Sequence, residues 1–289
     1  MQLSLISLAL TKVYGGVAAF SPSSLFASGE QGAWYDPSDL SMMFQDSAGT
    51  TPVTADGQPV GLILDKSSGL VLGADIAPNT FNALNATITN GGTFPSTATA
   101  TASTYGFVVS AITTAGKYYE YSMSWTGNIN NRTLQVGDGS YGPTSTLQSG
   151  TITGRILTSG TQIYAYIFGA TVGESFTVTD ITCKLVSGNH ATQATAASRP
   201  LKTSTGAAYW TNYDAVDDVL NTTFPSSLGS SCTVCRANVG AAPTILTAQT
   251  IGTSYADSTD NAGLIIINRA LTGQETTDVT AWLTAKGAT

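Results

Sequence analysis

The stretch from residue 105 to residue 185 contains short runs in which large apolar residues alternate with polar ones. In the clearest run, every second residue is large and apolar: Tyr119, Tyr121, Met123 and Trp125. Period-two alternation places such side chains on one face of an extended strand. Clusters of Gly, Asn and Asp, such as residues 127–131, are typical of turns. Short strands at this spacing, without a helical pattern between them, predict an antiparallel β-sandwich.

The composition is that of a folded chain with few charges. Only 10% of the 289 residues are charged, whereas 42% are hydrophobic and the chain has 12 Tyr and 4 Trp. Disordered chains lack such an apolar content. The net charge of −7 argues against a nucleic-acid-binding surface, which needs clustered Lys and Arg. The length fits one large or two ordinary domains.

A helix signal follows Asp36. This residue can cap a helix, and Pro37 fits a first helical turn. The apolar residues that would then share one face, at i, i+3 and i+4, are Leu40, Met43 and Phe44. The pattern predicts a short helix near residues 37–45.

A second helix signal lies near the C-terminus. Thr272 and Glu275 have the spacing of a capping box. The apolar residues that follow at helical spacing are Val279, Trp282 and Leu283, and Lys286-Gly287 supplies a basic last turn and a terminating glycine. We therefore expect a helix over residues 273–286.

The three cysteines, Cys183, Cys232 and Cys235, do not form a disulfide framework, because their number is odd. Cys232 and Cys235 have the spacing of a redox or zinc motif. A zinc site would need two further ligands, and the sequence offers only Cys183 and the single histidine, His190. We expect the cysteines to be small buried residues in strands, and we expect no cofactor.

The N-terminal segment, residues 1–28, is expected to be an anchoring arm. Its first 20 residues are mildly apolar, but Lys12 interrupts the run and no basic region precedes it. The segment is too short and too interrupted to cross a membrane. It could dock on a partner or on its own oligomer, or it could be a simple N-terminal strand.

Two distant segments resemble the two halves of one sequence motif. They are Asp65-Lys66-Ser67 and the run from Ser187 to Gln193, with the sequence SGNHATQ. Together they resemble a motif found in surface appendage proteins of tailed bacteriophages, within a domain related to laminin-G and concanavalin sandwiches. Residues 213–220 (YDAVDDVL) resemble a strand of the same family, although Tyr213 and Ala215 depart from its pattern. Residues 267–287 resemble the end of that family's domain.

The resemblance implies that one domain is inserted into another. The host domain would comprise residues 29–67 and 187–289. Residues 70–186, whose pattern resembles jelly rolls of the carbohydrate-binding-module type, would form the insert. The expected fold is therefore mainly β, with two antiparallel, jelly-roll-like β-sandwiches and the two helices above.

Three functional hypotheses follow from this resemblance. The first is a structural and adhesive virion protein: a tail fibre, collar fibre or head spike that attaches to host-surface glycans. The second is a decoration or cement protein without a ligand. The third, a polysaccharide depolymerase, has little support, because His190 is the one histidine, no G-x-S-x-G motif is present and Glu is rare. We expect no enzyme activity.

The adhesive hypothesis sets the expected partners and location. The arm would contact other virion proteins, and the protein would form a homo-oligomer. We expect neither nucleic-acid binding nor membrane insertion. The protein would be made in the bacterial cytoplasm and located on the surface of the particle.

Glycan binding calls for aromatic rings on a rigid sheet with polar neighbours. Two aromatic stripes qualify, one from Tyr119 to Trp125 and one formed by Tyr164, Tyr166 and Phe168, but one stripe must form the core. The candidate glycan-binding residues are Tyr118, Tyr141, Trp125, Asn130 and Asn131. No metal is expected; the weak calcium candidates are the loop carboxylates Asp217, Asp218, Asp257 and Asp260.

Overall fold

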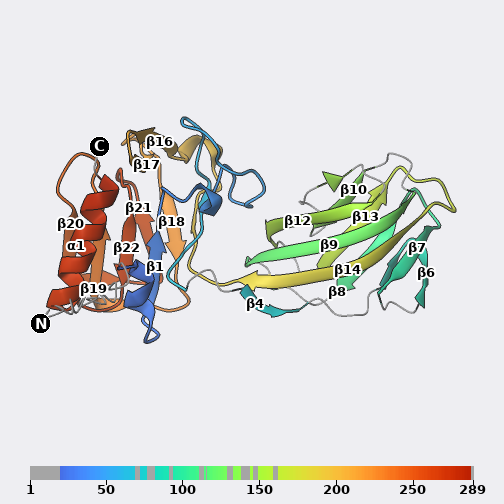
Figure 1. Ribbon diagram of the computed structural model, residues 1–289, viewed down its shortest axis with the longest axis horizontal. Coiled ribbons are helices and arrows are strands. Elements are labelled where there is room, and N and C mark those ends of the chain that lie inside the picture. The colour runs from blue at the N-terminus through green and yellow to red at the C-terminus, as the bar shows by residue number, and fades with distance from the viewer. Residues whose placement is uncertain are drawn as a thin grey trace, which may run out of the picture.

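The computed structural model describes residues 20–68, 72–76, 82–90, 94–110, 114, 116–128, 133–137, 144–145, 149–158 and 162–287. Two β modules lie side by side along the longest axis (Figure 1). We call residues 20–67 together with 187–287 the host module, and residues 72–186 the insert module. The predicted fold class, mainly β sandwiches with a C-terminal helix, is confirmed.

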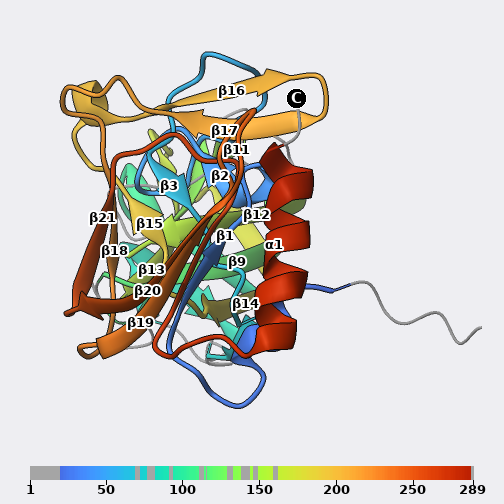
Figure 2. The ribbon, with the colours of Figure 1, turned by 90° about the vertical axis from the view of Figure 1, so that its left-hand side faces the viewer.

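The host module is a sandwich of two antiparallel sheets. One sheet has the order β1 (Gly32–Tyr35), β22 (Leu264–Ile267), β19 (Gly229–Arg236), β20 (Thr244–Ile251). The other has the order β2 (Met43–Phe44), β3 (Leu62–Ile63), β15 (Ala191–Thr192), β18 (Leu220–Thr223), β21 (Ser254–Asp257). Their facing side chains, such as Tyr35, Ile63 and Ile266, form one buried cluster. A hairpin of β16 (Leu201–Thr205) and β17 (Ala208–Asn212) lies across one end of this sandwich (Figure 2).

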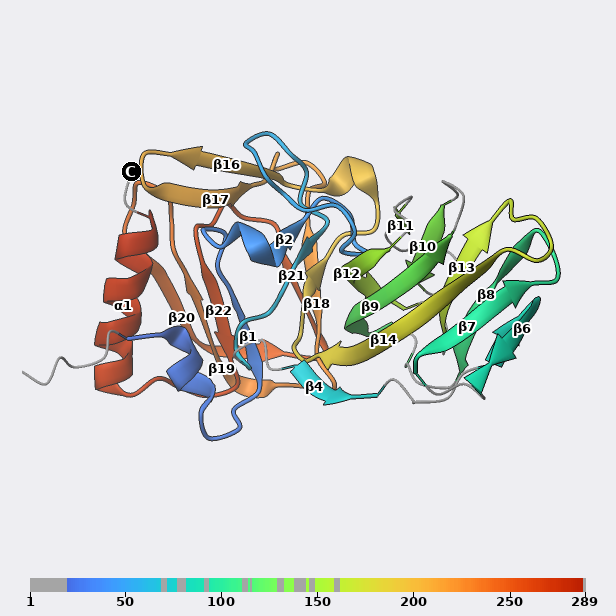
Figure 3. The same ribbon diagram turned by 45° about the vertical axis from the view of Figure 1, so that its right-hand side comes forward.

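Helix α1 (Gly273–Gly287) covers the outer face of the first sheet. Val279 and Leu283 pack there against Trp34 and Ile265. The capping box is confirmed, because the Glu275 N–H donates to Thr272 Oγ1 (3.2 Å) and the Thr272 N–H donates to Glu275 Oε2 (2.8 Å). The helix lies on the side of the host module away from the insert (Figures 1 and 3). No helix within the described residues is long and apolar enough to cross a membrane.

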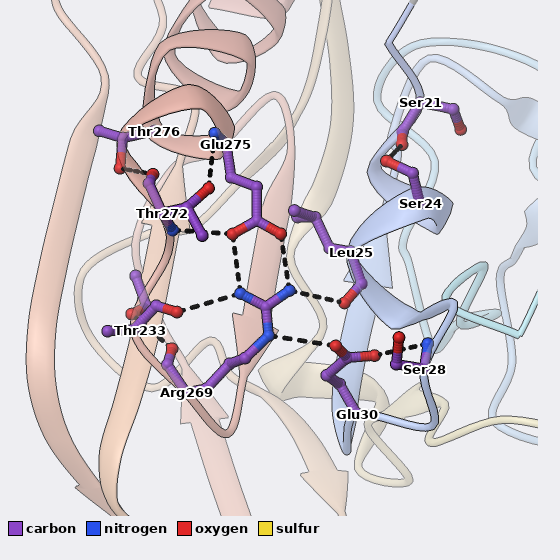
Figure 4. Close-up of polar contacts among 11 residues, drawn as sticks. Ser21, Ser24, Leu25, Ser28, Glu30, Thr233, Arg269, Thr272, Glu275 and Thr276 are labelled. Atoms are coloured by element: carbon purple, nitrogen blue, oxygen red, sulfur yellow. Dashed lines mark hydrogen bonds and ion pairs between the residues drawn. The ribbon is translucent and has the colours of Figure 1, made fainter.

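A short 3-10 helix, η1 (Pro22–Phe26), lies beside α1 and is held through Arg269 (Figure 4). The Arg269 guanidinium binds both carboxylate oxygens of Glu275 at 2.7 and 2.8 Å. It also donates to Glu30 Oε1 and to the Leu25 carbonyl, each at 3.2 Å. The hydrogen bond from Arg269 is the main reason that the pKa of Glu275 falls to about 2. One arginine therefore joins the start of the described chain to its last helix.

The insert module is a second sandwich. One sheet has the order β12 (Gly150–Leu157), β9 (Tyr118–Asn128), β14 (Ser175–Val186), β7 (Ser96–Ala100), β6 (Ala86–Thr89), and β4 (Leu72–Asp75) pairs with β14. The other has the order β11 (Thr144–Ser145), β10 (Leu134–Gly137), β13 (Gln162–Phe168), β8 (Thr104–Ser110), β5 (Asn82–Leu84). The face of β9 that carries Tyr121 and Trp125 supplies much of the buried cluster between them.

The expected helix over residues 37–45 is wrong. A 3-10 turn, η2 (Leu40–Met42), is followed directly by strand β2. Met43 faces the core between the host sheets, whereas Phe44 faces the insert module, as the period of a strand requires. Asp36 accepts hydrogen bonds from Ser38 and from Lys286 Nζ instead of capping a helix. Tertiary burial on both faces therefore outweighs the local helix signal.

The cysteines are buried and free, as expected. Cys232 and Cys235 both lie on β19 but on opposite faces: Cys232 packs between the two host sheets, and Cys235 packs under α1. This placement keeps the two thiols from acting as a redox pair or as ligands of one ion. Burial raises the pKa of Cys235 to about 12, which makes its thiol a poor nucleophile.

Candidate functional site

A row of aromatic residues lies on the outer face of the insert sheet that contains β13. Along this strand, Ile163, Ala165 and Ile167 point into the core. The intervening residues, Tyr164, Tyr166 and Phe168, are not members of that core cluster and share the opposite face. Strand β13 lies between β10 and β8 (Figure 3), so the row runs along the central strand of its sheet.

Neighbouring rings of this aromatic row meet edge to face. The centroids of Tyr164 and Tyr166 are 6.1 Å apart with an interplanar angle of 84°. Those of Tyr166 and Phe168 are 4.7 Å apart with an angle of 83°. Such T-shaped contacts are favourable, and they hold each ring in place for its neighbour. The row is therefore preorganised rather than a set of loose side chains.

Two amide side chains complete the row. The Tyr166 hydroxyl donates to Gln135 Oε1 at 2.7 Å, and Gln135 lies directly opposite Tyr166 on β10. The Tyr164 hydroxyl donates to Gln162 Oε1 on the same strand face. The face thus combines aromatic rings with amide groups, which can exchange hydrogen bonds with a hydroxylated ligand.

The members of the row differ in exposure. Phe168 is 45% exposed, whereas Tyr166 is only 6% exposed and Tyr164 is intermediate. Phe168 packs edge to face against Tyr166, yet nearly half of its surface is open to solvent, so it is the ring best placed to meet a ligand. Tyr166 packs against Phe168, and the half-buried Tyr164 adds further aromatic surface to the same face.

Two of the residues that the sequence suggested for glycan binding are buried. Trp125 is 2% exposed within the core of the insert, because the stripe to which it belongs faces inward. Tyr118 is 5% exposed and packs between the modules, where its hydroxyl donates to the Ser47 carbonyl. Tyr141, Asn130 and Asn131 lie outside the described residues. Alternation had identified both stripes, but it did not show which of them faces solvent.

The four calcium candidates do not gather at one place. Asp257 is buried and pairs with Arg236 (2.8 Å), and Asp260 accepts a hydrogen bond from the Tyr213 N–H (2.7 Å). Asp217 and Asp218 lie together with Asp214, and their carboxylates approach within 4.8 Å of one another. Asp214 Oδ1 also accepts hydrogen bonds from the backbone N–H groups of residues 216–218, which order this loop.

A cleft of about 350 Å³ lies where the two modules meet. The insert contributes Lys117 and Tyr118, and the host contributes His190, Thr223 and Phe224. Beside the cleft, the apolar residues Met42, Phe44, Leu62, Leu64, Tyr118 and Val186 form a buried cluster that joins the modules. This apolar contact between the modules therefore lies directly beside the cleft and includes two of its lining residues, Tyr118 and Val186.

His190 is a structural residue at the floor of this cleft. Its Nδ1 accepts a hydrogen bond from the Asp65 N–H (3.0 Å), so the proton lies on Nε2, which faces the Val186 carbonyl at 3.3 Å. Burial, together with the positive charges of Lys117 and Arg155, lowers the pKa of His190 to about 4. The imidazole is therefore neutral near pH 7 and joins the end of β14 to the segment that precedes the insert.

No protein-family model and no curated protein matches the chain. Among solved structures, the chain is similar to the CBM22-1 xylan-binding domain of Xyn10C from Paenibacillus barcinonensis, with 13% identity and a TM-score of 0.28, covering 41% of this chain and 95% of that one. It is also similar to the N-terminal CBM22-1–CBM22-2 tandem domain of the same protein, with 11% identity and a TM-score of 0.30, covering 77% of this chain and 96% of that one.

Proposed function

We propose that the insert module binds an extended saccharide on its outer sheet face, with Phe168 and Tyr164 as the contact rings. The observation that carries this proposal is the 45% exposure of Phe168 at the end of an ordered aromatic row. Sugar rings present apolar C–H faces that stack on aromatic side chains. Their hydroxyls can exchange hydrogen bonds with the amides of Gln135 and Gln162 and with the Tyr164 hydroxyl.

A single site of this kind binds weakly, because few rings take part. Adhesive proteins overcome this by presenting many copies, so that anchoring at one site raises the effective concentration at the next. We therefore propose that the protein acts as a homo-oligomeric adhesin. Support for a phage virion as its setting comes from the resemblance of residues 65–67 and 187–193 to phage appendage proteins.

In that setting the N-terminal segment would attach to other virion proteins, and the insert would face outward. The described chain begins at Phe20, which packs with Leu25 against the α1 side of the host module. That side is opposite the insert (Figures 1 and 3). Locating the chain in the assembled particle by cryo-electron microscopy tests this arrangement. An insert buried against neighbouring subunits would support the cement hypothesis instead.

Native affinity electrophoresis against a panel of soluble polysaccharides tests the glycan proposal directly. We expect at least one polysaccharide to retard the wild-type chain. Phe168→Ala and Tyr164→Ala should each weaken that binding about five- to ten-fold, because each removes one stacking ring. Val172→Ala is the matched control, since Val172 is 68% exposed on the turn that follows β13. Equal retardation of all four proteins, or no retardation of the wild type, would contradict the proposal.

A further inference from the structure

The cleft between the modules has the size of a ligand site. Its volume of about 350 Å³ falls in the range of small-molecule pockets, roughly 300–1,000 Å³. Its walls come from both modules, and it lies apart from the aromatic row, since none of the row's residues lines it. Any ligand bound here would touch the host and the insert at once.

The floor of the cleft is rigid. The rings of Tyr118 and His190 meet edge to face, with centroids 5.0 Å apart. Tyr118 is also held by its hydrogen bond to the Ser47 carbonyl, and His190 by the Asp65 N–H. A ligand would therefore meet a preformed surface and would not have to order it, which favours binding.

The charge of the cleft differs from that of the whole protein. The chain carries 18 acidic and 11 basic residues, yet none of the described residues that line the cleft is Asp or Glu. Lys117 is exposed at its edge, and within the described residues no ion pair involves its ammonium group. Because His190 is neutral near pH 7, Lys117 is the one charged group that the described lining residues offer to a ligand.

The remaining lining can hold a hydroxylated molecule. Thr192 and Thr223 bring hydroxyl groups to the cleft, which can donate to and accept from ligand hydroxyls. Pro225, which is exposed, adds apolar surface against which the C–H groups of a sugar ring can lie, whereas Phe224 is buried in the host core.

We propose that this cleft is a second ligand site, specific for a small hydroxylated carboxylate of the size of one uronic acid residue. Lys117 binds the carboxylate, and the threonine hydroxyls bind the ring hydroxyls. An anion fits because, among the described residues, no ion pair involves the Lys117 ammonium group and no carboxylate lines the cleft. This inference does not depend on the glycan site of the aromatic row.

Titration of the full chain, labelled with nitrogen-15, with sodium glucuronate tests the proposal, and glucose serves as the neutral probe. We expect glucuronate to shift backbone resonances on both sides of the cleft and glucose to have little effect. Lys117→Gln should weaken glucuronate binding about ten-fold or more. Lys184→Gln, the same change on the same module outside the cleft, should leave binding unchanged.

A second variant tests whether binding needs the open volume of the cleft as well as the charge of Lys117. Thr223 is exposed on strand β18, so Thr223→Trp should fold and fill the cleft while Lys117 stays in place. We expect it to abolish glucuronate binding. Phe168→Ala should retain it, which keeps this test distinct from that of the aromatic row. The proposal is overturned if glucuronate causes no shifts, or if glucose and glucuronate cause equal shifts. It is also overturned if the Lys117 and Lys184 variants bind glucuronate equally well.

Discussion

The backbone N–H of Asp65 donates a hydrogen bond to Nδ1 of His190 at 3.0 Å, although the two residues are 125 positions apart in the sequence. The Asp65 carboxylate is fully buried and accepts hydrogen bonds from the backbone N–H groups of Trp34 (2.9 Å) and Asn189 (2.8 Å). It also accepts from the N–H and the hydroxyl of Ser67, each at 2.8 Å. The host segments on either side of the insert, residues 65–67 and 189–190, are thus joined to each other where the insert begins and ends.

Replacing Asp65 by Ala should destabilise the protein by about 3 kcal/mol. The change leaves the N–H groups of Trp34, Ser67 and Asn189 without their acceptor in a buried site, and each such loss costs about 1–3 kcal/mol before relaxation. The measurement is urea unfolding followed by fluorescence. Asp180→Ala, at an exposed position of β14, is the control and should stay within about 0.5 kcal/mol of wild type. A loss below about 1 kcal/mol for Asp65→Ala would contradict the role assigned here.

The pKa of His190 can be measured without assignment, because the chain contains one histidine. We expect its imidazole proton resonances to titrate with a pKa of about 4, chiefly because of burial. The folded pKa lies below the unfolded value of about 6.5, so the unfolded state binds the proton more readily. The stabilising contribution is complete above pH 6.5 and declines as the pH falls towards 4, by up to about 3 kcal/mol. A titration midpoint between pH 6 and 7 would show that the ring is not buried as described.

Deleting the insert tests how far the modules depend on each other. With residues 68–186 removed and Ser67 joined to Ser187, both host sheets and α1 remain complete. We expect a cooperatively melting product with a lower melting temperature, because the deletion uncovers Phe44 and Leu62 at the junction. Phe44→Thr in the deletion variant should reduce its self-association, as light scattering can report. If the deletion variant that carries Phe44→Thr is insoluble, or melts without cooperativity, the two modules fold as one unit.

Removing the Arg269 side chain should loosen both η1 and the first turn of α1. Arg269→Ala loses the paired contact with Glu275 and those with Glu30 and the Leu25 carbonyl. Because these groups are partly exposed, we expect a destabilisation of about 2 kcal/mol. Hydrogen exchange should accelerate at Thr276 and at Ser24, whose N–H groups bond within these turns.

Arg269→Lys provides the comparison for this variant, since it keeps the charge but loses the forked geometry. We expect it to recover part of the stability and none of the paired contact with Glu275. Full recovery by lysine would mean that charge alone, and not the guanidinium geometry, holds η1 against α1.

Local patterns in the sequence were enough to determine the secondary structure of much of the chain. The capping box of Thr272 and Glu275 identified α1, because its hydrogen bonds join residues three positions apart. Alternation from Tyr119 to Trp125 identified strand β9 for a similar reason, since side-chain parity is a local property of extended backbone. The β-sandwich class followed from the repetition of such strands.

Only the tertiary structure decided which faces are buried. Parity separates the two faces of β13 but does not say which one meets the other sheet, so Phe168 could not be distinguished from a core ring. Tyr118 was buried by the junction of the modules, and Met43 and Phe44 became a strand because each face met a different core. The cleft at His190 likewise unites residues that are far apart in the sequence. Burial depends on which distant strands come together, and no pattern confined to one segment contains that information.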